Sequence, residues 1–416
     1  MTGMKHQKPY GGKPRFFYGY IVVAVAFITT MIAWGINYSF GVFFTPMIVQ
    51  FGWTRAMTSG AISLAMLTEG LGGALMGWLY DRFGARVVVT LCGLLLGLGC
   101  ILTAQTSYIW QLYLFYGLTL GLGLSASFVS PMSTVARWFV ERRVGVMTGI
   151  AIAGSSAGAL VISPVANQLI LAYGWRTSYI IIGVTALVII VSVAQLLKRP
   201  APQGSQAQYD TDDTKSFTNK SELRQYTFEE STRTRQFWLA CGAFICFGIC
   251  EYSIMVHIVP HGIVLGLSPT SATSVLVVFG AFSIPSRIII GNTVDKFGSR
   301  RVLTIGFISI LMALLWLQIA KEPWMLYLFA AVFAFGIASG VVTLSTIIVE
   351  LFGIMSHGTL LGILNLTACI GCAIGPVLTG WLFDMSANYM TAFLVSAIIA
   401  ATGLALTILI TSTKTI

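Results

Sequence analysis

Charged residues are scarce in this chain of 416 residues: Asp, Glu, Lys and Arg make up 9% of the sequence, against 56% for the hydrophobic types. A soluble globular protein carries about a quarter charged residues, so most of the surface of this chain must face something other than water. The sequence also lacks a GKS/T phosphate loop and an HExxH zinc pair. These absences argue against a soluble enzyme, and we expect no catalytic site, no metal and no cofactor.

Cysteine gives no sign of a disulfide framework or a zinc site. All seven cysteines lie inside long apolar runs, away from any extracellular loop or cluster of metal ligands. They are Cys92, Cys100, Cys241, Cys246, Cys250, Cys369 and Cys372. The Cys369-x-x-Cys372 spacing is known from redox motifs, but here it lies in a run rich in Gly and Ala. We therefore interpret these two cysteines as small packing residues.

Long apolar runs are abundant instead. Twelve of them are long enough to cross about 30 Å of hydrocarbon as a helix. They cover residues 16–44, 56–78, 87–105, 108–133, 145–171, 175–197, 237–263, 270–293, 301–320, 323–350, 358–382 and 388–411. The first run is too long for the apolar core of a signal peptide, so we expect it to remain as a span. The sequence predicts an all-α membrane protein with twelve transmembrane helices.

The basic residues are distributed unevenly over the predicted loops. If the spans alternate and both termini are cytoplasmic, twenty Lys and Arg residues lie on the inner side and three (Arg55, Arg176 and Lys321) on the outer side. The positive-inside rule predicts such a bias. We therefore expect a multi-pass protein of the cell (inner) membrane with both termini in the cytoplasm. The net charge of +10 then needs no nucleic-acid partner.

A polar stretch divides the chain into two parts. Residues 198–236 are rich in Pro, Ser, Thr, Gln and mixed charge, which predicts a cytoplasmic linker. It separates an N-terminal six-helix bundle, 1–197, from a C-terminal six-helix bundle, 237–416. The two parts also resemble each other, since Ser163-Pro164 in the fifth span corresponds to Gly375-Pro376 in the eleventh. We interpret the chain as an internal duplication with pseudo-symmetry between the bundles.

A short charged cassette occurs once in each half, GWLYDRFGAR at 77–86 and GNTVDKFGSR at 291–300. The shared pattern G-x-x-x-D-[RK]-x-G-x-R resembles the signature loop of the major facilitator superfamily, and with the six-plus-six topology this resemblance covers nearly the whole chain. It implies loops that hold the two halves together during part of a transport cycle. We expect the glycines to permit close helix packing, the aspartates to accept bonds from helix N-terminal amides, and the arginines to bond cytoplasmic carbonyls. The predicted gating residues are Gly77, Asp81, Arg82, Gly84, Arg86, Gly291, Asp295, Gly298 and Arg300.

A narrower resemblance lies in GLGLSASFVSPMSTVARWFVERRVGVMTGIAIAGSSAG, residues 121–158. This run is similar to the monocarboxylate transporter family and its bacterial relatives, including oxalate:formate antiporters, and residues 34–46 and 257–268 share the likeness. The acidic residue typical of the animal family's first span is absent. The resemblance implies a secondary active transporter of small monocarboxylates such as lactate or pyruvate. It would work by proton symport and alternating access, as a monomer in the lipid bilayer. A carboxylate anion exchanger, or a dicarboxylate or amphiphile carrier of the same fold, is the alternative.

One basic residue, Arg287, lies inside a predicted span. Its guanidinium keeps its proton at any ordinary pH, and at the bilayer centre it costs at least about 2.5–3.5 kcal/mol. A water-filled cavity between the halves, with a carboxylate as bidentate counter-ion, accounts for such a residue; a structural ion pair with a buried acid is the alternative. In the monocarboxylate family an arginine at this spot binds the substrate carboxylate, and an acid one turn earlier handles the proton. This chain has Ser283 in place of that acid.

Three other residues are candidates for taking the proton. Glu69 in the second span is the pseudo-symmetric counterpart of Ser283. Glu251 and His257 share the seventh span, but at six residues apart they do not lie on one face. His257 titrates in the useful range. The sequence favours His257 and Glu69 over Glu251, and each of the three could instead be structural.

Further residues near the predicted midplane complete the candidate binding site. A first-span tyrosine lines the cavity of oxalate:formate antiporters, which favours Tyr38. The eleventh-span lysine of that subfamily corresponds to Ala368 here, and the one remaining cation predicts one carboxylate per substrate. The candidate substrate-binding residues are Arg287, Tyr38, Asn37, Tyr116, His257, Asn365, Ser283, Phe335 and Cys369.

Overall fold

The computed structural model describes residues 18–139, 144–198, 226–353 and 357–410, and every regular element within them is a helix. The N-terminal half comprises α1 (Gly19–Phe51), α2 (Arg55–Phe83), α3 (Ala85–Thr103), α4 (Ile109–Leu112), the π-helix η1 (Tyr113–Leu120), α5 (Gly121–Trp138) and α6 (Val144–Ala194). The C-terminal half comprises α7 (Phe228–Thr232), α8 (Arg235–Val264), α9 (Pro269–Phe297), α10 (Ser299–Leu317), α11 (Pro323–Phe352), α12 (His357–Ser386) and α13 (Tyr389–Leu409).

Ten stretches of helix in the described part of the chain are long and apolar enough to cross a bilayer. One of them lies in α6, which has 51 residues and breaks at Gly174, where φ is 76°, so that it supplies two spans. The 29-residue α2 is less apolar but as long as its neighbours. The ten stretches, the second span of α6 and α2 together account for the predicted twelve spans. The all-α membrane fold is thus confirmed.

The two charged cassettes end their helices in the same way. Gly84 closes α2 with φ of 85° and donates its N–H to the carbonyl of Tyr80. Gly298 closes α9 with φ of 84° and donates its N–H to the carbonyl of Val294. Side chains disfavour this left-handed backbone, so glycine is required at both positions. The repeated glycine thus produces the same sharp turn into α3 and into α10.

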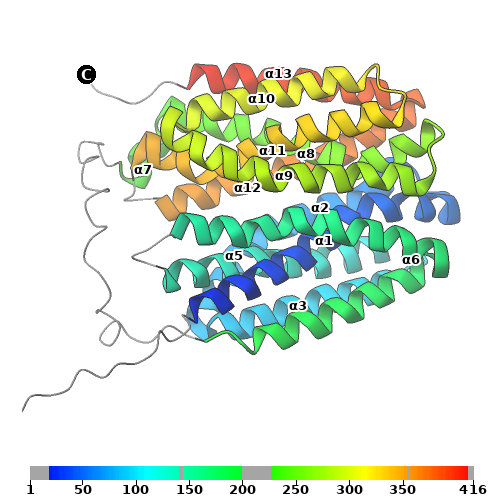
Figure 1. Ribbon diagram of the computed structural model, residues 1–416, viewed down its shortest axis with the longest axis horizontal. Helices are drawn as coiled ribbons and strands as arrows, with labels where there is room; N and C mark the ends of the chain where they lie inside the picture. The colour runs from blue at the N-terminus through cyan, green and yellow to red at the C-terminus, as the bar shows by residue number, and fades with distance from the viewer. Residues whose placement is uncertain (1–17, 140–143, 199–225, 354–356, 411–416) are drawn as a thin grey trace, which may run out of the picture.

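The two halves lie side by side, with the N-terminal half (blue to green) below the C-terminal half (green to red) in Figure 1. Their long helices run roughly parallel to the long axis. The most extensive contacts between the halves are those of α2 with α12, α6 with α9, and α1 with α8. We call the end at which α2 ends and α8 begins the linker end, and the end at which α1 ends and α2 begins the distal end.

Glycine allows the halves to approach closely at these crossings, as two examples show. A Cβ on Gly41 of α1 would lie 2.9 Å from the carbonyl oxygen of Val256 in α8. A Cβ on Gly280 of α9 would lie 2.7 Å from the carbonyl oxygen of Ser156 in α6. Gly291 of the second cassette differs, because a Cβ there would meet nothing within 4 Å. The predicted role of Gly291 in close packing is therefore wrong for this structure.

Two glycines of α6 offer a matched test of close helix packing within the N-terminal half. A Cβ on Gly158 would lie 2.7 Å from the backbone nitrogen of Gly35 in α1, whereas one on Gly149 would meet nothing within 4 Å. We expect Gly158→Ala to lower the melting temperature of the detergent-solubilised protein, because overpacking costs about 1–3 kcal/mol. Gly149→Ala should leave it unchanged or raise it, since alanine favours a helix by about 0.5–1 kcal/mol. Thermal unfolding followed by tryptophan fluorescence measures both, and equal shifts would contradict the argument.

Candidate functional site

A cationic side chain lies at the boundary between the halves. Arg287 of α9 donates from Nη1 to the carbonyl oxygen of Ile152 at 2.7 Å and to Oγ of Ser155 at 3.0 Å, both in α6 of the other half. Its Nε is buried without a hydrogen-bond partner among the described residues. No carboxylate oxygen in the described part of the chain lies within 4.0 Å of the guanidinium. The structure therefore gives this cation neutral partners on one side and an unused N–H on another.

Tyr38 of α1 and Glu251 of α8 lie near this guanidinium, close enough for each to interact with it electrostatically. These two side chains are also close enough to interact with each other, and they are 5% and 6% exposed. The acid that the structure brings to Arg287 is thus Glu251, which the sequence had placed behind His257 and Glu69. Spacing alone showed that Glu251 and His257 face different sides of α8. Which side faces Arg287 depends on how α8 packs on α9.

Polar side chains continue along the same boundary. Tyr252 donates its hydroxyl to Oδ1 of Asn37 at 2.8 Å, while Nδ2 of Asn37 is buried without a described partner. Ser156 of α6 donates to Oγ of Ser283 at 3.0 Å. The predicted residues Asn37, Tyr38, Ser283 and Arg287 therefore all lie where the two halves meet.

A second buried acid lies on the α2–α12 side of the boundary. The thiol of Cys369 donates to Oε2 of Glu69 at 2.9 Å, and Nδ2 of Asn365 lies 3.8 Å from the Cys369 sulfur. Glu69 and Cys369 are each 6% exposed. Cys369 thus makes a polar contact between the halves, so the interpretation of it as a packing residue was incomplete.

His257 lies nearer the distal end and makes a different set of contacts. Its Nε2 lies 2.9 Å from the carbonyl oxygen of Pro376 and 3.2 Å from Oγ of Ser59, and its Nδ1 lies 3.2 Å from the hydroxyl of Tyr389. The ring is fully buried. One turn further on, His261 packs edge-on against Tyr389. The structure therefore separates His257 from the group around Arg287.

A distal contact that the sequence analysis missed joins the halves next to His257. Both carboxylate oxygens of Asp384 in α12 accept backbone N–H groups at the start of α2, from Arg55 at 3.1 Å and from Ala56 at 2.9 Å. The Arg55 side chain donates from Nη1 to the Tyr389 hydroxyl at 2.7 Å. Its guanidinium also lies 4.0 Å from the centre of the Phe383 ring. In the sequence, Arg55 at the start of a span indicated only the orientation of the protein in the membrane, not a contact between the halves.

Two predicted binding residues lie inside a bundle instead of at the boundary. Tyr116 of η1 is fully buried, with its ring centroid 4.6 Å from that of Phe40. Phe335 of α11 packs against a small cluster that includes Ile290 and Val294 of α9. The structure does not bring either residue to Arg287, and the sequence could not show this because both lie at a suitable depth in their spans.

Two of the cassette arginines, Arg86 and Arg300, bond groups at the linker end of their own half. Arg300 donates from Nη2 to the carbonyl oxygen of Ile408 in α13 at 2.6 Å, as predicted. Arg86 donates from Nε to the side-chain oxygen of Gln195, just beyond α6, at 2.6 Å, so its partner is an amide side chain instead of a backbone carbonyl. Arg82 lies 5.4 Å from the ring centre of Trp78 on its own helix. Each cassette arginine thus contacts groups within its own half.

The side chains of the cassette aspartates Asp81 and Asp295 lie outside the part of the chain that the structure describes. A carboxylate nevertheless caps α10 in the way predicted for the second cassette. Oε2 of Glu350 in α11 accepts the backbone N–H of Ser299 at 2.6 Å. A helix N-terminus favours such an anion.

Among the described residues, the hydrogen bonds between the halves lie at Arg287 or on its distal side. Toward the distal end lie the contacts of Asp384 and His257, and a bond of 3.1 Å from Asn167 in α6 to Thr270 in α9. The described contacts therefore close the distal end of the boundary.

Two matched bundles with buried polar groups between them are typical of secondary transporters. The family model of the Major Facilitator Superfamily matches residues 25–317 and 262–415. The chain belongs to this superfamily. Its members are transporters, in agreement with the absence of an enzyme motif in the sequence.

Curated relatives extend over most of the chain. Human monocarboxylate transporter 11 is 26% identical over 406 residues, covering 94% of this chain and 83% of the relative. Human monocarboxylate transporter 2 is 25% identical and covers 92% and 82%. The MFS-type transporter YhjX of Escherichia coli strain K12 is 27% identical over 349 residues, 83% of each chain. These superfamily members agree with the resemblance found in residues 121–158.

Solved structures of the superfamily share the fold. A bacterial homolog of the human lysosomal transporter Spinster, in an inward-facing and occupied conformation, matches with a TM-score of 0.73 at 16% identity. It covers 96% of this chain and 97% of its own. The same homolog in an inward-facing and unoccupied conformation gives a TM-score of 0.69.

Proposed function

We propose that this protein transports small monocarboxylates such as lactate or pyruvate together with a proton, and that Arg287 binds the carboxylate. The buried, unpartnered Nε of Arg287 is the observation that carries the proposal. A buried donor without a partner costs about 1–3 kcal/mol, and more when it is charged. A carboxylate that accepts from Nε and from the neighbouring Nη2 removes this cost through two parallel charge-assisted bonds.

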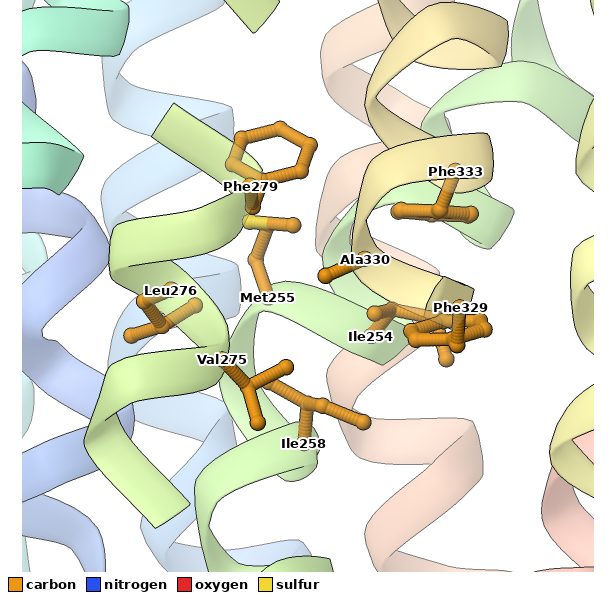
Figure 2. Close-up of a pocket in the computed structure, with 9 residues that line it drawn as sticks. All are labelled: Ile254, Met255, Ile258, Val275, Leu276, Phe279, Phe329, Ala330 and Phe333. Carbon is orange, nitrogen blue, oxygen red and sulfur yellow. The ribbon is translucent and has the colours of Figure 1, made fainter. Parts of the chain in front are cut away.

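The surroundings of Arg287 favour a small substrate with one carboxylate. Arg287 is the one Lys or Arg away from the ends of the predicted spans, and Ala368 leaves no second cation at the matching position of α12. Tyr38, beside the guanidinium, packs against the Phe279 ring with centroids 6.4 Å apart. Phe279 also lines a small cavity between α8, α9 and α11, and all of the lining side chains are apolar, as Figure 2 shows. An alkyl or hydroxyalkyl group fits beside these residues better than a second anion.

Glu251 is our candidate for the transported proton. It lies near Arg287 and Tyr38, so an ionised Glu251 and a bound substrate carboxylate would repel each other beside one cation. A proton on Glu251 removes this repulsion. Substrate binding to Arg287 and proton binding to Glu251 therefore favour each other, as symport requires.

The position of Arg287 supports alternating access as the mechanism. Its Nη1 bonds to α6 of the other half, so binding of the substrate acts directly on the boundary along which the halves move. In the orientation of the positive-inside rule, the distal end faces the outside and the linker end the cytoplasm. The closed distal end then corresponds to a state that exchanges substrate with the cytoplasm.

Uptake of labelled lactate into proteoliposomes with an imposed pH gradient tests the proposal. We expect accumulation when the outside is more acidic, approaching about tenfold for a gradient of one pH unit, because an electroneutral one-to-one symporter equates the two gradients. A collapsed gradient should allow equilibration only. Uptake that is independent of the pH gradient, but requires a carboxylate anion inside the proteoliposomes, would instead identify an exchanger. No saturable uptake across a panel of monocarboxylates would contradict the substrate class.

A further inference from the structure

The distal contact between the halves contains a continuous chain of hydrogen bonds that ends on a histidine. We call Arg55, Ser59, His257, Asp384 and Tyr389 the distal cluster. Asp384 binds the first amides of α2, the Arg55 side chain binds the Tyr389 hydroxyl, and this hydroxyl lies 3.2 Å from Nδ1 of His257. The cluster thus joins α2 of one half to α8, α12 and α13 of the other.

The contacts of His257 define its protonation state in this arrangement. Nε2 lies 2.9 Å from the carbonyl oxygen of Pro376, which only accepts, so Nε2 must carry a hydrogen. Ser59 uses its own hydrogen on the carbonyl oxygen of Arg55, so its Oγ also faces Nε2 as an acceptor. Tyr389 already receives an N–H from Arg55 and has its own hydrogen free for Nδ1. The cluster therefore fits a neutral His257 that accepts at Nδ1.

A second proton on His257 would disrupt this chain. Nδ1 would then carry a hydrogen and could no longer accept from the Tyr389 hydroxyl. The hydroxyl hydrogen of Tyr389 would be left without an acceptor. The imidazolium would also place a positive charge near the Arg55 guanidinium, with which His257 interacts electrostatically. Both effects are unfavourable in a fully buried site.

We propose that the distal cluster is a proton-operated gate: it holds the distal end closed while His257 is neutral, and protonation of His257 opens it. A proton arriving from the distal side would thereby favour the state that accepts substrate from that side. This role is separate from proton transport by Glu251 and does not depend on which substrate is carried. It requires only that the two halves move apart at the distal end.

The charged and titratable groups around His257 come from four helices. Arg55 of α2 is the nearest charge, Tyr389 of α13 is in direct contact, and His261 lies one turn along α8. Asp384 of α12 acts through the start of α2. From α1, the uncharged ring of Phe44 packs edge-on against His257 with centroids 5.1 Å apart. Asp384 also titrates at low pH, so the test must separate its response from that of His257.

Distance measurements between spin labels across the distal end test the gate without substrate. Val49 of α1 and Ile319 beyond α10 are 78% and 60% exposed and lie outside the cluster, so Val49→Cys and Ile319→Cys report on separation of the halves in nanodiscs. We expect one short distance at pH 8 and a growing longer component toward pH 5. His257→Gln, whose amide donates and accepts but does not titrate, should keep the short distance at both values.

Variants that remove single links of the cluster should open the gate without acid. Tyr389→Phe and Asp384→Asn should each raise the ratio of open to closed molecules at pH 8 about tenfold, because each removes bonds made by a charged partner. Tyr327→Phe is the matched control for the first, since its hydroxyl bonds to Ser274 within the C-terminal half. Glu322→Gln is the control for the second, as an exposed distal acid that caps no helix through its side chain.

The measurements distinguish His257 as the proton sensor from Asp384 as the sensor, and from the absence of a gate. An acid response that persists in His257→Gln but disappears in Asp384→Asn would make the carboxylate the sensor and overturn the role of His257. Equal behaviour of Tyr389→Phe and Tyr327→Phe would overturn the gate itself. Lactate uptake plays no part in these measurements, so failure of the proposed substrate would leave them unaffected.

Discussion

Arg287→Lys is expected to weaken monocarboxylate binding by about ten- to a hundredfold while the protein remains folded. A lysine keeps the charge, but its ammonium cannot offer the two parallel N–H groups of a guanidinium. Loss of one charge-assisted bond costs about 1.5–3 kcal/mol. The lysine also loses the bonds to Ile152 and Ser155 that hold the side chain in place. Arg287→Gln, which removes the charge as well, should abolish saturable uptake.

Ligand-induced thermal shifts with a panel of mono- and dicarboxylates, followed by lactate uptake at several concentrations, measure this effect. Arg176→Lys is the matched control, because Arg176 donates to the carbonyl oxygen of Ala104 within the N-terminal half, away from Arg287. The control should retain the affinity of the unmodified protein. Unchanged lactate affinity in Arg287→Lys would disprove bidentate recognition at this residue.

Glu251→Gln is expected to separate substrate movement from the proton gradient. Glutamine is isosteric with a protonated glutamate and stays neutral at every pH, so it permits a carboxylate at Arg287 without taking up or releasing a proton. Accumulation driven by one pH unit should fall from about tenfold to none. Exchange of internal for external lactate should continue, since the loaded carrier still crosses between its two states. Both are measured in proteoliposomes.

Glu69→Gln is the matched comparison. Glu69 is equally buried but bonds to Cys369 at the α2–α12 side, and Arg287 is not among the groups with which it interacts. It should retain accumulation driven by the pH gradient. Loss of coupling in Glu69→Gln, together with normal coupling in Glu251→Gln, would reassign the transported proton to Glu69.

The spans and the turns between them could be predicted because they depend on short stretches of sequence. The length of an apolar run fixes whether it crosses a bilayer. The glycines at 84 and 298 fix left-handed turns at equivalent places in the two halves, because side chains disfavour that backbone. The prediction for Gly291 was wrong for a related reason: a glycine permits close packing, but only the neighbouring helix decides whether it occurs.

The neighbours of the titratable residues could not be predicted in the same way. Depth along a span is readable from the sequence, and it placed Tyr116 and Phe335 near the midplane. The sequence does not show which neighbouring helix a side chain points toward. In the structure, Tyr116 and Phe335 both point into the interior of a bundle. Helix direction also brings Glu251 near Arg287, whereas the sequence had favoured His257 and Glu69 over Glu251 as candidates for taking the proton.

The sequence by itself determined an all-helical membrane protein, with one cation well inside a span and no acid one turn before it. These properties follow from hydrophobic length, loop charge and backbone geometry, which are local. Only the tertiary structure decided that Glu251 and Tyr38 lie near Arg287, and that Asp384 meets the start of α2 beside His257. Such contacts join helices from opposite halves, so they depend on the rotation and depth of each helix against a partner far away in the chain.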